Sequence, residues 1–92
     1  MGNSPTFEKD PNAVLDYVWN WEDWLASGET ISTSSMIVDN GITKDSDSKT
    51  DTRTKIWLSG GTAGTAYAVT NRIVTSDGRT DDRTIYIKVI ER

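Results

Sequence analysis

The chain alternates apolar and polar side chains over several short segments, as β-strands with one buried face do. The first such segment is residues 14–21, and one face of it carries the large side chains Leu15, Tyr17, Trp19 and Trp21. The same residues also fit a helix, whose apolar stripe would run through Tyr17 and Trp21 to Trp24. We favour the strand, because aromatic and β-branched residues dominate the segment. Trp19 and Trp21 are then expected in the core, and Trp24 is expected to be partly exposed.

Further strands are predicted where β-branched and aromatic residues lie between turn residues. With the segment above, the predicted strands span residues 14–21, 30–38, 54–59, 66–75 and 79–90. Asn40-Gly41 ends the second of them, and the glycine-rich residues 60–65 form a turn. Residues 43–53 mix charged side chains with Ser and Thr, which indicates a solvated, mobile loop.

The last two strands form a hairpin whose register follows from charge. A two-residue loop would set Arg72 opposite Arg83, and opposed like charges destabilise a sheet. A three-residue loop instead places Gly78 at the left-handed position that such loops favour, and it pairs Arg72 with Asp82. The same register pairs Thr70 with Thr84, Val69 with Ile85 and Tyr67 with Ile87. The predicted core face of the hairpin is Tyr67, Val69, Ile73, Ile85, Ile87 and Val89.

Residues 1–11 are predicted to be an extended N-terminal arm. Pro5 and Pro11 bracket a polar stretch with one apolar anchor, Phe7, and each proline favours an extended residue before it. The remaining residues, 12–92, are predicted to form one all-β domain, an antiparallel β-sandwich. The length fits a seven-strand immunoglobulin-like sandwich.

Composition excludes most familiar active sites. The chain has neither cysteine nor histidine, which rules out disulfides, thiol nucleophiles, His-based triads and zinc sites of the usual ligands. Its 14 acidic and 10 basic residues give a net charge of −4 without a basic run, which argues against nucleic-acid binding. No apolar stretch is long enough to span a membrane, and the first eight residues lack the pattern of a secretory signal. We therefore expect no enzymatic activity, no cofactor, no metal site, and neither a nucleic-acid nor a membrane partner.

Three local patterns resemble functional motifs and depart from them. The glycine-rich residues 60–65 lack the lysine of a phosphate loop. The alternating acids of residues 45–51 resemble a calcium loop, but Thr50 stands where glycine is required and Ile56 where a bidentate glutamate is required. A pair of carboxylates for glycoside hydrolysis would need a sugar cleft, for which so small a domain has little room. The carboxylates considered for it are Asp16, Glu22 and Asp23.

Two strings of residues resemble a small family of tailed bacteriophages and prophages. The first string is residues 9–17, continued by Trp21, Trp24-Leu25, Gly28 and Thr30-Ile31. The second is residues 57–65, continued by Tyr67, residues 69–73 and residues 75–81. The family is that of immunoglobulin-like tail proteins or fibre–tail adaptors. The resemblance implies a structural component of the virion, in its tail or neck, that is made in the cytoplasm of the bacterial host.

The leading hypothesis is therefore an adaptor, present in several symmetric copies, that joins the tail or baseplate to fibre proteins. The predicted interface residues are Pro5, Phe7, Asp10, Pro11 and Trp24. The arm would pack on a neighbour or add a strand to it, and unpaired edge strands would supply backbone donors. The alternative is a carbohydrate-binding module of the virion that contacts host surface glycans through Trp24 and acidic loops. A small hydrolase is the third hypothesis.

Overall fold

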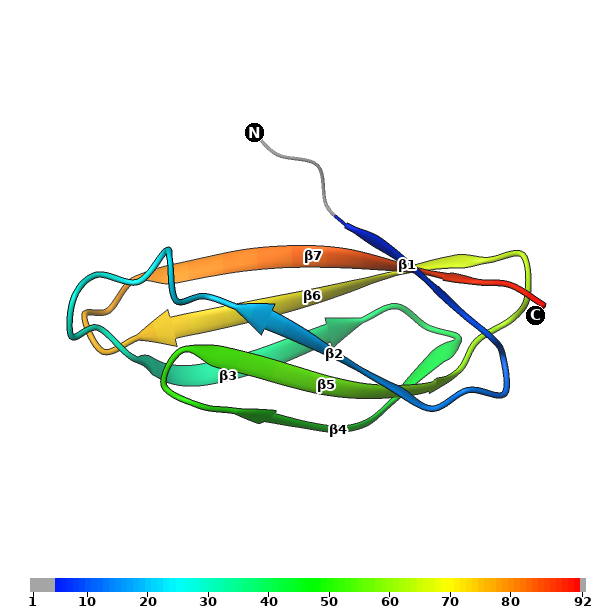
Figure 1. Cartoon of the computed structure of the whole chain (residues 1–92), viewed down its shortest axis with the longest axis horizontal. Helices are drawn as coiled ribbons and strands as arrows, with labels where there is room; N and C mark the ends of the chain where they lie inside the picture. The colour runs from blue at the N-terminus through cyan, green and yellow to red at the C-terminus, as the bar shows by residue number, and fades with distance from the viewer. Residues whose placement is uncertain (1–4, 92) are drawn as a thin grey trace.

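The computed structural model describes residues 5–91, which form a sandwich of two β-sheets. The strands are β1 (Thr6–Lys9), β2 (Leu15–Asn20), β3 (Ile31–Val38), β4 (Ile42–Lys49), β5 (Arg53–Gly60), β6 (Ala66–Thr75) and β7 (Thr80–Val89). One sheet has the order β1-β7-β6-β3 and the other β2-β5-β4, and they face each other in an elongated body (Figure 1). The prediction of an all-β sandwich is confirmed. The immunoglobulin-like assignment stays a prediction.

The predicted hairpin is present in the predicted register. Arg72 lies opposite Asp82, Thr70 opposite Thr84, Val69 opposite Ile85 and Tyr67 opposite Ile87. Two nitrogens of Arg72 donate to the two carboxylate oxygens of Asp82 at 2.8 and 2.9 Å, and Gly78 has a φ of 85°. All six residues of the predicted core face are buried. The predicted three-residue loop and the pairing of Arg72 with Asp82 are therefore confirmed.

The segment rich in tryptophan is a strand, as predicted. Tyr17 and Trp19 of β2 are buried between the sheets, and Trp21 directly after β2 has no exposed surface. Leu15, at the start of β2, is 39% exposed because it lies at the end of the sheet. The helix alternative was wrong, since the register of β2 against β5 continues from Leu15 to Asn20.

The prediction that residues 43–53 form a loop was wrong. Ile42–Lys49 form β4, which pairs antiparallel with β5, and a tight turn follows in which Thr50 N donates to Arg53 O at 2.8 Å. Only Ile42 of β4 is buried. An edge strand with both faces in water needs no apolar alternation, so the pattern that reveals the other strands is missing here.

The arm predicted at residues 1–11 is in part a strand of the body. Residues 1–4 lie outside the described part of the chain, and Thr6–Lys9 form β1, parallel to β7. Lys9 is fully buried, and its Nζ donates to Gly60 O at 2.7 Å and to Asp10 O at 3.0 Å. This burial lowers the pKa of the Lys9 ammonium, against the opposing effect of nearby carboxylates. Lys9 thus fastens β1 to the last residue of β5 in the opposite sheet. The division into arm and sandwich stays a prediction.

A buried asparagine joins the two sheets. Asn71 of β6 has no exposed surface, and its Oδ1 accepts hydrogen bonds from Trp21 Nε1 at 3.0 Å and Thr54 Oγ1 at 2.6 Å. Its Nδ2 donates to Ser34 Oγ of β3 at 2.9 Å. One side chain therefore satisfies polar groups on both sheets, and each of these groups would be costly to bury alone.

Candidate protein interface

The predicted interface residues lie in two separate places. Pro5 directly precedes β1, Phe7 lies in it, and Asp10 and Pro11 lie in the turn that follows it. Trp24 lies in the loop between β2 and β3. In Figure 1 this loop is at one end of the body and the turn after β1 is at the other. The structure therefore does not bring the five residues together.

The residues near β1 contact their own chain as well as solvent. The Phe7 ring is 41% exposed, and its centroid lies 5.3 Å from that of Tyr17 in the opposite sheet. Pro5 O accepts a hydrogen bond from Tyr86 N at 2.9 Å. Asp10 shapes the following turn, since its Oδ1 accepts from Asn12 N at 2.8 Å. Phe7 is thus the residue of this group that offers a large apolar surface at the rim of the sandwich.

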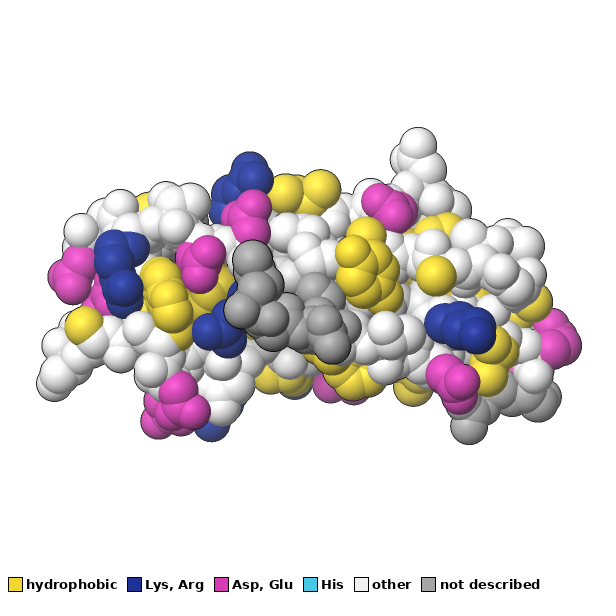
Figure 2. Space-filling view, turned by 90° about the horizontal axis from the view of Figure 1, so that it is seen from above, with side chains coloured by type: hydrophobic (Ala, Val, Ile, Leu, Met, Phe, Trp, Pro, Cys, Tyr) yellow, Lys and Arg dark blue, Asp and Glu magenta, His cyan; other side chains and the backbone are white. Residues whose placement is uncertain are grey.

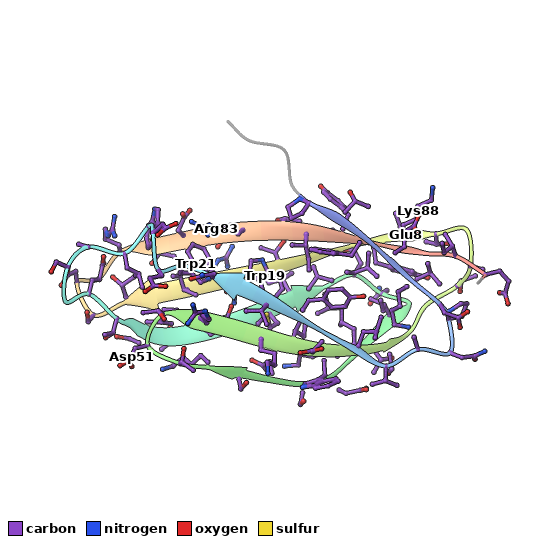
Figure 3. All side chains as sticks on the ribbon, viewed as in Figure 1. Glu8, Trp19, Trp21, Asp51, Arg83 and Lys88 are labelled. Carbon is purple, nitrogen blue, oxygen red and sulfur yellow. The ribbon has the colours of Figure 1, made fainter. Side chains whose placement is uncertain are left out.

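Trp24 is half-buried in a cluster of aromatic and guanidinium groups. Its ring meets Trp21 edge-on at 5.5 Å, and the Arg79 guanidinium lies 3.9 Å from its centroid. Arg79 Nη2 also donates to Trp24 O at 3.2 Å. The Arg83 guanidinium covers the Trp21 ring in the same way, 4.1 Å from its centroid. Trp21 and Arg83 are labelled in Figure 3. Arg79 therefore occupies one of the two faces of the Trp24 ring. A sugar that stacked on Trp24 could not use this face.

A buried carboxylate holds this cluster to the β6–β7 turn. Glu29 is only 4% exposed and accepts hydrogen bonds from Arg79, from the Thr75 hydroxyl and from Ala26 N. These bonds, the one from Arg79 first, lower the pKa of Glu29 to about 2. Sequence reasoning missed this pair, because Glu29 and Arg79 are 50 positions apart and no local pattern links them.

Replacing Glu29 by glutamine is expected to reduce the acid sensitivity of the fold. The pKa is about 2 in the folded chain against an ordinary 4.5, so the carboxylate stabilises the fold fully above 4.5 and loses that effect as the pH falls through about 2. Urea unfolding between pH 6 and pH 2 should show a smaller loss of stability for Glu29→Gln than for the wild type. Near neutral pH, the free energy of unfolding of Glu29→Gln should be lower than that of the wild type.

The control is Glu22→Gln, since the Glu22 side chain is 60% exposed and lies 3.4 Å from Arg53. This variant should follow the wild-type curve. A Glu29→Gln variant with the same acid dependence as the wild type would contradict the assignment.

Several large apolar side chains are exposed at the surface of the sandwich. They are Phe7, Val14, Leu15, Val18, Ile37, Trp57 and Tyr86. On the face that Figure 2 displays, apolar side chains are interspersed with polar and charged ones. A half-open hollow of about 320 Å³ lies on the sheet of β2, β5 and β4, lined by Val18, Ser48, Lys49, Thr50, Arg53, Thr54 and Lys55. Surfaces of this kind suit contact with another protein.

Within residues 5–91, no cluster of three or more acidic side chains is placed to hold an ion. Nor does any helix in this range have the length and apolar character needed to span a membrane.

Residues 9–88 match the model of one protein family, described as Podophage GP4 fiber-tail adaptor protein gp77. The chain belongs to this fiber-tail adaptor family. No curated protein matches it. Membership confirms the resemblance to phage fibre–tail adaptors, and it makes the chain a structural adaptor of a phage, with a place in the virion tail. Membership in an adaptor family fits this structure, whose distinctive features are its exposed apolar side chains, its sheet edges and its packed aromatic clusters.

Proposed function

We propose that this protein joins the tail or baseplate of a phage to its fibre proteins by protein–protein binding. The family match over residues 9–88 carries the proposal. The body measures 43 × 28 × 19 Å; the loop with Trp24 lies at one end of its long axis, and β1 runs from above the middle of the body to the turn at the other end. A body of that form can contact two different partners at once. Several copies around the tail axis would repeat the same contacts by symmetry.

The proposed contacts use the residues in and around β1, together with the turn after it, and Trp24 at the opposite end of the body. Phe7 supplies exposed aromatic area, and Pro5 before β1 and Asp10 and Pro11 after it are proposed to complete the contact. Trp24 is held in place by Arg79, so it would lose little conformational freedom on binding. Preorganised aromatic residues of this kind are common anchors of interfaces.

We propose a binding role without catalysis. Two of the carboxylates considered for hydrolysis lie near cations: Asp16 Oδ2 is 4.0 Å from Lys55 Nζ, and Glu22 Oε1 is 3.4 Å from Arg53 Nη2. The hollow beside them is lined chiefly by hydroxyl groups and cations, and a general acid needs a carboxyl group.

Mixing the purified chain with the tail and fibre proteins of its own phage tests the proposal. Size-exclusion chromatography with light scattering should show one complex that contains all three proteins. Phe7→Ser should weaken one of the two pairwise contacts, whereas Leu15→Ser, at a residue of similar exposure, should not. Binding to neither protein would refute the proposal. A shift of tryptophan fluorescence with host polysaccharide alone would favour the carbohydrate-binding alternative.

A further inference from the structure

The edge strands of the two sheets differ in how they are protected. In the described part of the chain the edges are β1 and β3 in one sheet and β2 and β4 in the other. Proteins guard such edges with charges, bulges or short strands, because an open edge pairs readily with other chains. Strand β4 has four charged residues and a bulge at Asp45, β1 is four residues long with two charges, and β2 is six residues long with one.

Strand β3 lacks most of this protection. It has eight residues, Ile-Ser-Thr-Ser-Ser-Met-Ile-Val, and none of them is charged or proline. Its only irregularity is the bulge near its start, between Ile31 and Thr33. From Thr33 to Val38 its register against β6 is regular. The stretch is therefore long and straight enough to pair with an added strand.

The backbone of β3 presents hydrogen-bonding groups to the open side. Asp39 N donates to Ala68 O across the β3–β6 ladder at 3.1 Å. Because bonded and non-bonded positions alternate along an antiparallel pair, the backbone groups of Val38, Met36 and Ser34 point away from β6. They form a row to which another strand can bond.

The side chains along this edge determine the chemistry of a partner. Met36 and Val38 are half-buried and pack against the core from its rim, so inward-facing residues of an added strand would cover them. Ile37 is 47% exposed on the outer face, next to Thr70. Of the charges on β4, Lys44 and Asp47 already satisfy each other at 2.9 Å, and Lys49 Nζ already donates to Ile31 O of β3 at 3.0 Å. A charged strand would gain no ion pair at β3 and would lose hydration there.

We infer that β3 is the docking edge for an extended, uncharged segment of a partner protein with apolar residues at alternate positions. The segment would add a fifth strand to the sheet β1-β7-β6-β3. The inference rests on the proposed function and names how one of the two contacts is made. A different protein fits better than a second copy, because each copy of this chain has a net charge of −4 and copies repel each other.

Amide hydrogen exchange on the intact chain, alone and with the fibre or the tail protein of the same phage, tests this inference. The amides of Ser34, Met36 and Val38 should exchange at least about tenfold more slowly with one of the two partners. Ile37→Lys and Ser35→Lys place a charge on the outer face of the edge, and each should weaken that contact at least about tenfold. Ser46→Lys, on the edge strand that is already charged, is the matched control and should bind as the wild type does.

The outcomes separate the inference from the proposed function. A complex that forms without slower exchange at β3, and with full affinity in both lysine variants, would overturn the docking edge and leave the adaptor role standing. A homodimer with protected β3 amides would overturn it in favour of pairing between copies. Binding to neither partner would overturn both.

Discussion

Replacing Asn71 by alanine is expected to lower the free energy of unfolding by about 2–4 kcal/mol. Trp21 Nε1 and Thr54 Oγ1 both donate to Asn71 Oδ1 in the wild type, and the variant would leave both donors buried without an acceptor. A buried donor without a partner costs more than the hydrogen bond contributed. For so small a domain this is a large part of the total stability, and urea denaturation followed by tryptophan fluorescence measures it.

Thr70→Ala is the matched control for this prediction. Thr70 neighbours Asn71 in β6 but lies on the outer face, where its hydroxyl is 2.7 Å from that of Thr84. Water can replace this bond, so we expect a loss of less than about 1 kcal/mol. Equal losses in the two variants would show that Asn71 does not join the sheets.

Replacing Trp21 by alanine is expected to cost about 3–5 kcal/mol, enough to leave much of the chain unfolded at 37 °C. Trp21 is the largest side chain without exposed surface, and it lies where Asn71, Trp24 and Arg83 meet. The substitution removes its packing, leaves a cavity and takes away one donor to Asn71. Thermal unfolding followed by circular dichroism measures the loss.

Trp57→Ala makes the same substitution on the outer face of β5, where the ring is 39% exposed. Its cost should stay near or below about 1 kcal/mol. If Trp57→Ala proved as damaging as Trp21→Ala, the assignment of inner and outer faces in the β2-β5-β4 sheet would be wrong.

The parts of the fold that could be predicted are those where burial or charge gave a local signal. Alternation located β2, and the like charges of Arg72 and Arg83 excluded the wrong hairpin register. Strand β4 gave no such signal, because the backbone pairing that makes it a strand comes from β5, which follows it in the chain. Asn71 could not be recognised as the central polar group, since its partners come from three other segments.

The candidate interface was harder to predict than the fold. The sequence indicated Phe7 and Trp24 as large side chains outside the core, and both retain exposed surface. It gave no sign that Arg79 covers Trp24, because a stacking contact between distant loops leaves no local pattern. The sequence shows that β3 carries no charge. This feature indicates a docking edge only once the structure places β3 at the edge of a sheet.

Cryo-electron microscopy of the intact virion tests the adaptor role most directly. We expect density for this two-sheet sandwich in several symmetric copies between tail and fibre, with the β3 edge extended by a strand of a neighbouring protein. Virions in which fibre and tail touch each other directly, with this sandwich elsewhere or missing, would contradict it.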